Sequence, residues 1–401
     1  MKESRQEMEA GYNRVGLKMD ERECVRMLAR ALLAAERLFR RTAATEPDKV
    51  KHVLVLEYML PLGTCVHLTP LFEALKLCRP DLTITVATRG LGLQVLRHSP
   101  YVDRLIETPN PLTDLRATFF FLRRHLRRVD VDCVLTGASD QRTRIALLGL
   151  LASGGWRGGY TVNPALYQQP LKYDWNSSLI TNNLRIGGLL GCNVQALEPR
   201  VFFSREDVET ARALVQKVNP AGRPLAVMVT QNSGGQATGW LTDRFVSVIR
   251  HATEEQGCAV AYVGTAGDAA AIDAIREAAN GIGTSIAGRT NVNELAAVLA
   301  MSDVMVTLDT GTMHVGRAVK TPMVVLGPSW QRPIEWLPLT VPNTRILRGE
   351  DRDAIPENYR LDEISEDSVI EALDDVLRTY PPDAVARERR VEESLSSIDL
   401  M

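Results

Sequence analysis

The sequence predicts an α/β fold with two Rossmann-like domains, each built on a parallel sheet, and three observations support this prediction. Apolar runs of strand length alternate with helical segments along most of the 401 residues, a pattern typical of parallel sheets flanked by helices. The alternation occurs twice, before and after a joint at residues 197–200. One segment, residues 306–326, contains the whole repeating unit of strand, polar turn, helix and second strand.

The first half is expected to form one domain over residues 46–198, preceded by a helical extension over residues 1–45. The polar stretch around Pro47 separates the two. Short, mainly apolar runs bounded by polar residues indicate the strands. The clearest strands are residues 53–56, 82–87 and 131–135, and the helices between them are residues 69–78 and 115–128.

The second half repeats the pattern over residues 199–380, and a charged tail is expected at residues 381–401. Residues 291–294, at the start of one expected helix, resemble a capping box, in which side chains accept hydrogen bonds from the free N–H groups of the helix. The expected strands are residues 225–229, 259–264, 304–308 and 322–326. The expected helices are residues 243–254, 268–279, 291–300, 313–319 and 366–378.

Composition excludes several classes of protein. A formal net charge of −2 gives no reason to expect nucleic acid as a partner. The start of the chain has no apolar core typical of a secretion signal, and no run approaches the roughly 20 apolar residues of a membrane span. The six scattered cysteines are expected to be thiols in a reducing cytoplasm rather than disulfide or zinc ligands. We therefore expect a cytoplasmic protein.

The turn after residues 306–308 is the best candidate for a binding site. Asp309 ends the strand, and Thr310, Gly311 and Thr312 open the next helix. N–H groups at a helix start have no partner within the helix and suit a phosphate, and ligands of open α/β sheets bind at the carboxyl ends of strands. The simpler alternative is that Asp309 and Thr310 only cap the helix.

The same turn carries a family resemblance. The run from Asp309 to His314, followed by Pro322 and by Leu326-Gly327-Pro328, resembles the signature of glycosyltransferase family 9, the ADP-heptose:lipopolysaccharide heptosyltransferases. Further similar segments occur in the expected order and spacing along most of residues 50–380. These segments are residues 53–55, 62–71, 100–103, 188–191, 288–290 and 294–296.

The resemblance implies a GT-B glycosyltransferase whose two Rossmann-like domains face each other across a cleft. Such an enzyme moves a sugar, here expected to be heptose, from a nucleotide diphosphate to a lipopolysaccharide-type or protein acceptor and inverts the anomeric centre. The nucleotide sugar, most simply ADP-heptose, is a co-substrate, and no cofactor or metal is implied. Two DxD sequences, at residues 130–132 and 351–353, lie outside the expected site.

The resemblance also implies which residues hold the donor. The turn at Asp309 would bind the diphosphate and sugar hydroxyls, and Asp268 would bind the ribose, although an acid at a helix start is equally explained by the helix dipole. Arg289 and Thr290 match part of a base pocket. The full implied donor set is Ser233, Gly234, Thr238, Gly264, Asp268, Arg289, Thr290, Asp309, Thr310, Gly311, Thr312 and His314.

The chain departs from the family pattern at two positions. Thr238 stands where the family has a lysine or arginine that pairs with phosphate, so Arg289 or Arg317 would have to replace it. Thr64, after Gly63, stands where the family has the aspartate that deprotonates the acceptor. A threonine hydroxyl does not titrate near neutral pH, so another residue must act as the base.

Three nearby residues are candidates for that base: Glu57, His67 and Asp140. We favour Asp140, because His67 also matches a structural position of the motif. The catalytic set is therefore Asp140, Thr64 and Asp309, with Gly63, Thr64 and His67 on the acceptor side. The two departures also keep open a catalytically silent GT-B protein that binds nucleotide sugar or acts as a scaffold.

Two segments suggest surface contacts. Residues 115–128 carry a basic face that would suit anionic lipid or a phosphorylated acceptor, although a solvated helix face explains it more simply. In the extension, Val25, Leu28, Leu32, Ala35 and Phe39 fall on one helical stripe. That stripe is expected to pack on the protein body or on another subunit of a homo-oligomer, with attachment to the inner membrane as the alternative.

Overall fold

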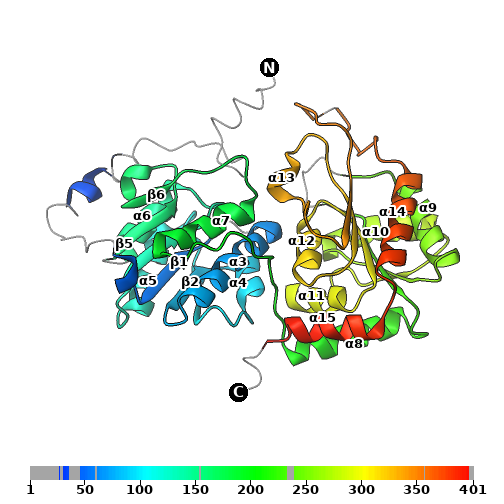
Figure 1. Cartoon of the computed structure of the whole chain (residues 1–401), viewed down its shortest axis with the longest axis horizontal. Coiled ribbons are helices and arrows are strands. Elements are labelled where there is room, and N and C mark those ends of the chain that lie inside the picture. Colours follow the sequence, from blue (N-terminus) through cyan, green and yellow to red (C-terminus); the bar gives the residue numbers. More distant parts are fainter. Residues whose placement is uncertain are drawn as a thin grey trace. The chain divides into compact units, whose positions relative to one another are not determined.

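A computed structural model of the chain describes residues 27, 30–35, 46–58, 61–152, 155–232, 239–355 and 357–396 (Figure 1). The chain divides into two compact units, Met1–Pro199 and Arg200–Met401. Each unit contains a six-stranded sheet whose neighbouring strands are all parallel. The predicted class, α/β with two Rossmann-like domains, is confirmed. None of the described helices has the length and apolar composition needed to cross a bilayer.

The first unit, coloured blue to green in Figure 1, has its central strand buried on both faces. Its strands are β1 (His52–Leu56), β2 (Thr83–Thr88), β3 (Arg104–Glu107), β4 (Cys133–Thr136), β5 (Trp156–Tyr160) and β6 (Gln169–Leu171), in the order β3-β2-β1-β4-β5-β6. Its helices are α3 (Leu62–Cys78), α4 (Gly90–Leu96), α5 (Leu115–Leu126), α6 (Thr143–Ala152) and α7 (Leu179–Gly187), with short 3-10 turns η1 (Pro47–Lys49), η2 (Pro164–Leu166) and η3 (Gly188–Leu190). Helix α3 packs against α4 and α7, whereas α5 packs against α6.

The second unit, green to red, has the equivalent order β12-β11-β10-β7-β8-β9. Its strands are β7 (Leu225–Val229), β8 (Ala259–Tyr262), β9 (Thr284–Ser285), β10 (Val304–Leu308), β11 (Met323–Leu326) and β12 (Thr344–Leu347). Its helices are α8 (Arg205–Val218), α9 (Thr242–Glu254), α10 (Ala269–Ala278), α11 (Val292–Ala300), α12 (Gly311–Ala318), α13 (Pro333–Trp336), α14 (Glu366–Thr379) and α15 (Ala384–Ser394), with the 3-10 turn η4 (Ala266–Asp268). Helix α11 packs against α8, α12 and α15, whereas α9 packs against α10 and α14.

In each unit an aspartate joins the amino ends of the two central strands. Asp132, directly before β4, accepts through Oδ2 from the N–H groups of Lys51 and His52 at the start of β1, at 2.8 Å each. Asp303, directly before β10, accepts through Oδ2 from the N–H of Leu225, the first residue of β7, at 2.7 Å. These bonds favour one register of the central strands, because a shifted strand would leave a carboxylate without its donors.

Two segments differ from the sequence-based expectations. Helix α3 begins at Leu62, earlier than the predicted helix over residues 69–78, so Gly63 lies within its first turn. There the N–H groups of Thr64 and Cys65 donate to the Pro61 carbonyl at 3.0 and 3.2 Å. Residues 384–394, expected as part of a charged tail, form α15. There Arg387 donates to both oxygens of the buried Asp303 at 2.7 Å each, an attachment that spans 84 residues and that local sequence cannot reveal.

Other local expectations agree with the structure. Asn291 begins α11 with a complete capping box closed by Glu294. In the amino-terminal extension, residues 30–35 are helical, and Leu32 and Leu33 pack against a cluster that includes Leu147 of α6. This helical segment therefore packs on the first unit, whereas Val25, Leu28 and Phe39 of the predicted stripe lie outside the described residues.

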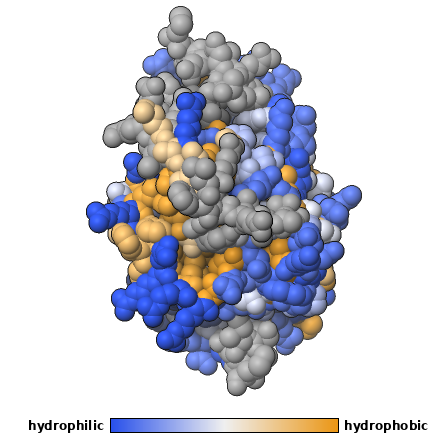
Figure 2. Space-filling model, turned by 90° about the vertical axis from the view of Figure 1, so that its left-hand side faces the viewer, coloured by the Kyte–Doolittle hydropathy of each residue, from blue (hydrophilic) through white to orange (hydrophobic). Residues whose placement is uncertain are grey.

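The surface of the first unit mixes exposed apolar and charged groups. Figure 2 shows hydrophobic surface lying directly beside hydrophilic side chains on the face that it turns toward the viewer. Helix α5 contributes to this mixture, because Phe120 is 57% exposed and is flanked by exposed arginines. Phenylalanine is among the residue types most often fully buried in folded proteins, so an exposure of more than half is unusual.

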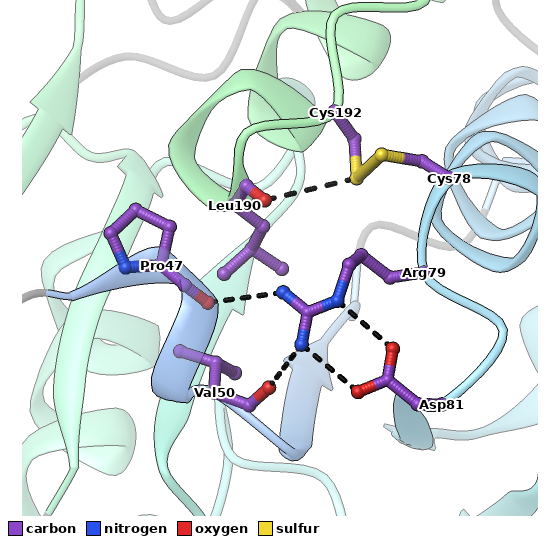
Figure 3. Close-up of a disulfide and its surroundings, with 7 residues drawn as sticks. All are labelled: Pro47, Val50, Cys78, Arg79, Asp81, Leu190 and Cys192. Carbon is purple, nitrogen blue, oxygen red and sulfur yellow. Dashed lines mark hydrogen bonds and ion pairs between the residues drawn. A yellow bond between two sulfur atoms is a disulfide. The ribbon is translucent and has the colours of Figure 1, made fainter.

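A disulfide joins Cys78, at the end of α3, to Cys192, which follows η3 (Figure 3). The expectation that the cysteines are all thiols is therefore wrong for this pair. The two residues are 114 positions apart in sequence, and only the packing of α3 against α7 brings their Cα atoms to 5.7 Å. Arg79 secures the same helix end by donating to the Val50 carbonyl and to Asp81, at 2.9 Å each.

Reduction of the Cys78–Cys192 disulfide is predicted to destabilise the first unit. The bond closes a loop of 114 residues in the unfolded chain, and loss of such a link typically costs about 2–4 kcal/mol. Dithiothreitol should lower the denaturation midpoint of the wild type and leave that of Cys78→Ser unchanged. The same midpoint for wild type with and without reductant would contradict the prediction. A thiol titration of the unfolded, unreduced protein should find four thiols, since two of the six cysteines are in the bond, and finding all six would also contradict the prediction.

Candidate functional site

Both sheets have a position where the direction of strand order reverses, and ligands of open α/β sheets bind there, beyond the carboxyl ends of the strands. The reversal lies between β1 and β4 in the first unit and between β7 and β10 in the second. The residues that follow these strands are Glu57 and Tyr58, Gly137 to Asp140, Thr230 onward, and Asp309 with Thr310. The predicted catalytic residues Asp140 and Asp309 therefore both lie at reversal points.

Thr310 is the N-cap residue of α12, but its side chain does not cap the helix. Its backbone is extended, with φ −139° and ψ 172°, and its hydroxyl is buried without a hydrogen-bond partner among the described residues. Buried hydroxyls without partners are rare because they lose their bonds to water. The simple capping explanation of this turn is therefore not what the structure shows for Thr310, and its hydroxyl remains available to a ligand.

Gly311 and Thr312 form the first turn of α12 and are partly exposed. Their N–H groups have no partner within the helix, as at any helix start. Together with the Thr310 hydroxyl they form a group of donors beside the end of β10. Donors at a helix start favour an anion, and a phosphate is the common biological one.

Asp309 lies in a largely buried polar cluster. Its Oδ2 accepts from the Gln331 side-chain amide at 3.1 Å when that amide is oriented so that its oxygen also accepts from Trp336 Nε1 at 3.0 Å. The His314 ring lies beside Trp336, with 5.8 Å between ring centroids. Burial, with a smaller contribution from the negative charge of Glu335, raises the pKa of Asp309 to about 7.

Asp309 and His314 do not form an ion pair, although Oδ1 and Nε2 are 4.0 Å apart. Burial, with a smaller contribution from the positive charge of Arg317, lowers the pKa of His314 to about 3. The imidazole is therefore neutral at physiological pH and cannot offset the charge of the carboxylate. With a pKa of about 7, Asp309 is present near neutral pH both as a protonated carboxyl group, which can donate a hydrogen bond, and as a carboxylate, which only accepts them.

The predicted ribose and base loops lie next to each other. The Gly288 N–H donates to the Gly264 carbonyl at 2.9 Å. Gly288 has φ +70°, and a Cβ there would lie 2.8 Å from the backbone of Ala266, so the close approach of the two loops requires glycine. Arg289 is exposed and Thr290 is half-buried directly after this contact.

Asp268 serves as a cap, as the helix-dipole alternative anticipated. Its Oδ2 accepts from both the N–H and the hydroxyl of Thr265, at 2.7 Å each. Its Oδ1 makes no bond to a described residue, so one oxygen remains for a hydroxyl of a ligand. The predicted loop residues Ser233, Gly234 and Thr238 lie outside the described residues.

In the first unit, Asp140 is buried and both of its oxygens are engaged. Oδ1 accepts from Arg142 Nε at 2.7 Å and Oδ2 accepts from the Tyr58 N–H at 3.0 Å. Glu57 is 1% exposed, and its carboxylate lies over Gly137, where a Cβ would be only 2.4 Å from Oε2. The ends of β1 and β4 thus bring two buried carboxylates to the same region of the sheet edge.

The predicted acceptor residues Gly63, Thr64 and His67 are all buried in α3. The Thr64 side chain has no exposed surface, and its hydroxyl donates to the Pro61 carbonyl at 2.6 Å. His67 is also fully buried, and its carbonyl accepts from the Asn183 side chain at 3.0 Å. The Thr64 hydroxyl therefore helps to close the first turn of α3.

Sequence reasoning missed Gln331, Glu335 and Trp336, which surround Asp309. The signal that could have found them is their position after β11, since this strand lies beside β10 and its following loop must reach the same sheet edge.

Among the residues that the structure describes, no three His, Cys, Asp or Glu side chains are arranged to hold a metal ion.

A family model described as glycosyltransferase family 9 (heptosyltransferase) matches residues 120–362. The chain belongs to glycosyltransferase family 9. The match includes the turn from Asp309 to His314 and also Asp140, whereas Gly63 and Thr64 precede it. A nucleotide-sugar glycosyltransferase of this family needs a donor site, and the buried cluster beside β10 is the candidate.

Solved structures with the same fold include three informative ones. A glycosyltransferase family 9 protein from Veillonella parvula aligns with a TM-score of 0.75 and 19% identity, over 84% of this chain and 100% of that chain. The E. coli ADP-heptose lps heptosyltransferase II aligns with a TM-score of 0.67 and 20% identity, over 82% of this chain and 99% of that chain. The E. coli heptosyltransferase WaaC, solved with ADP-2-deoxy-2-fluoro heptose, aligns with a TM-score of 0.60 and 15% identity, over 81% of this chain and 99% of that chain. No curated protein matches the chain.

Asp309→Asn is predicted to stabilise the second unit at alkaline pH. The pKa of Asp309 is raised to about 7, so folding favours its protonated form, and its ionisation costs stability as pH rises through about 7. An amide cannot ionise, so the variant should gain on the order of 2–4 kcal/mol at pH 8.5 and roughly 40% of that at pH 5, since the loss of stability builds up between the unfolded and folded pKa values. Denaturation curves at the two pH values measure this difference.

The matched variant is Glu335→Gln, which removes the second cause of the raised pKa of Asp309. It should stabilise in the same direction but by a smaller amount. A gain from Asp309→Asn that is equal at both pH values would show that ionisation of Asp309 is not the cause.

Proposed function

We propose that the protein transfers heptose from ADP-heptose to a lipopolysaccharide-type cell-envelope acceptor, with inversion of the anomeric centre and without a metal ion. The observation that carries this proposal is the Thr310–Thr312 turn, which presents a buried, unpartnered hydroxyl and free helix N–H groups beside Asp309. Membership of family 9 supports it. The structures of E. coli WaaC with ADP and with an ADP-heptose analogue support adenine and heptose as the donor components.

In this proposal the second unit holds the donor. The diphosphate accepts hydrogen bonds from Thr310, Gly311 and Thr312, and these fixed donors stabilise the charge that builds on it as the sugar leaves. Asp309, supported by Gln331, binds sugar hydroxyls. The free oxygen of Asp268 takes the ribose, and Arg289 with Thr290 lines the base pocket. Arg289 or the buried Arg317 supplies the positive charge that Thr238 lacks.

The proposed reaction is an in-line displacement. The acceptor hydroxyl oxygen attacks the anomeric carbon, the bond from that carbon to the diphosphate breaks, and ADP leaves with the bonding electrons. The proton of the acceptor passes to a base, for which Asp140 is the favoured residue and Glu57 the alternative. Asp140 would have to release Arg142 or the Tyr58 N–H to accept that proton.

A catalytically silent, nucleotide-sugar-binding protein is the second candidate. Two observations favour it: the Thr64 hydroxyl is bound to Pro61, and both oxygens of Asp140 are engaged. Turnover distinguishes the two functions. For the active enzyme we propose a cytoplasmic location, where nucleotide sugars are made, and peripheral contact with the inner membrane. The acceptor would be a lipid-linked glycan or a protein. A homo-oligomer is compatible with these roles.

Thr310→Val is predicted to weaken ADP binding without loss of stability. Valine has the shape of threonine and removes a buried hydroxyl that has no partner in the described structure, so the melting temperature should stay equal or rise. Loss of a hydrogen bond to a charged phosphate should raise the Kd for ADP at least about tenfold. Isothermal titration calorimetry measures it, and Thr379→Val, exposed at the end of α14, is the matched control. Wild type that does not bind ADP at millimolar concentration would refute the donor site.

Turnover tests the proposed function directly, as ADP released from ADP-heptose in the presence of a lipopolysaccharide core acceptor. EDTA should leave the rate within about twofold, and Asp140→Asn should lower it about 10²–10⁴-fold. Thr64→Asp should be neutral or harmful, because it places a carboxylate at a position with no exposed surface. If Glu57→Gln removes the rate and Asp140→Asn does not, the base is Glu57. A silent wild type that gains turnover as Thr64→Asp with Thr238→Lys would establish the second candidate.

A further inference from the structure

Helix α5 presents one face to the core of the first unit and an unusual one to solvent. Thr118, Leu122 and Leu126 are at most 5% exposed and face the core. At about 100° per residue, Arg116, Phe120, Arg123 and Arg127 fall within about 60° of one another, on a side of the helix roughly 130° away from these core-facing residues. With the adjacent Arg124 and Arg128, these six residues are called the arginine face below.

The charges of the arginine face are not balanced by neighbouring acids. None of its five arginines makes an ion pair or hydrogen bond with any described residue, and residues 116–128 contain no Asp or Glu. Two acids lie nearest in the sequence, each two residues from one of these arginines. Asp114 caps α5 by accepting from the Ala117 N–H at 2.8 Å, and Asp130 is exposed and forms no ion pair with any of the five arginines. In a chain of net charge −2, five arginines without an ion-pair partner among the described residues therefore lie along α5 and the turn that follows it.

An aromatic ring lies within these charges. Phe120 is 57% exposed, and the Arg116 guanidinium lies 5.8 Å from its ring centroid. Phe119 is also paired with a cation, Arg123, at 5.9 Å. One face of the Phe120 ring is thus covered by Arg116, which hinders stacking of a nucleic-acid base, whereas the rest of the ring projects beyond the helix among groups that attract phosphate.

The arginine face is also tied to the candidate acceptor edge. The Thr118 hydroxyl of α5 donates to the Pro109 carbonyl at 3.1 Å, and the neighbouring Thr108 hydroxyl donates to the Tyr58 hydroxyl at 2.9 Å. Tyr58 in turn donates its N–H to Asp140. A surface bound to α5 would therefore lie close in structure to the sheet edge that holds Glu57 and Asp140.

We propose that the arginine face of α5 docks on an anionic phospholipid bilayer. The arginines match its negative surface charge, each contributing about fivefold to binding near such a surface, and Phe120 enters the headgroup region, where aromatic rings are favoured. Lipid is preferred over nucleic acid because a protruding ring that is covered on one face by a cation suits insertion better than stacking. The inference does not depend on sugar transfer, since a silent protein would dock equally.

The test is sedimentation of full-length protein with vesicles of pure phosphatidylcholine or with about 30% phosphatidylglycerol. We expect at least about tenfold stronger binding to the anionic vesicles, lost in 0.5 M NaCl as charge screening requires. Arg123→Gln with Arg127→Gln should weaken it about 25-fold, the product of two fivefold effects. The matched control, Arg97→Gln with Arg205→Gln, removes two exposed arginines elsewhere and should leave binding within about threefold.

Phe120 has its own readout. Phe120→Ala should weaken vesicle binding with little change in binding to heparin, and the added tryptophan of Phe120→Trp should shift its emission to the blue on anionic vesicles only. Failure of wild type to sediment with anionic vesicles would overturn the proposal. The proposal would also be overturned if both double variants lost vesicle binding equally, or if Arg123→Gln with Arg127→Gln bound vesicles as wild type does. A Phe120→Ala variant that bound vesicles as tightly as wild type, and heparin likewise, would overturn it as well. Circular dichroism of each variant verifies folding.

Discussion

The bond from an aspartate to the start of the central strand is the constraint on which each unit depends. Asp132 fixes β1 against β4, and Asp303 fixes β7 against β10. Because the register of these strands is set at their amino ends, the positions of their carboxyl ends follow from strand length alone. Glu57 and Asp140 in one unit, and Asp309 in the other, are placed by this pairing.

The candidate donor site differs from the rest of its unit because the fold leaves some of its polar groups without protein partners. Asp303 and Asp309 are both buried aspartates next to β10, but Asp303 has an arginine and a backbone donor, whereas Asp309 has a neutral histidine and an amide. The Thr310 hydroxyl has no partner among described residues. Unpaired buried polar groups cost stability, and they occur at this edge of the sheet but not at the edge that holds Asp303. The polar ligand proposed above would provide the missing partners.

Sequence reasoning succeeded where structure is determined by neighbouring residues. The apolar runs of β1 and β10 are central strands covered on both faces, and the capping box at Asn291 is closed within four residues. The turn at Asp309 was recognisable because strand, donors and helix follow one another directly. In each case the physical cause, burial or a short-range hydrogen bond, can be recognised from the sequence itself.

The features that were missed join residues far apart in the chain. The Cys78–Cys192 bond depends on the packing of α3 against α7, and the Asp309–Gln331–Trp336 cluster depends on where the loop after β11 returns. Asp140 shows both cases: Arg142 is two residues away, but its other partner, Tyr58, comes from the segment after β1. The burial that shifts the pKa of Asp309 is likewise a property of the packed unit and not of the motif.

The attachment of α15 to Asp303 has a consequence for how this unit could be inherited or recombined. Arg387 balances a buried charge that adjoins the two central strands, and removal of one partner of a buried ion pair typically costs about 3–5 kcal/mol. The last helix is therefore part of the structural module formed by the second unit, even though it lies beyond the family match. A gene fusion that exchanged this module between relatives would have to carry its final segment along, or replace Asp303 at the same time.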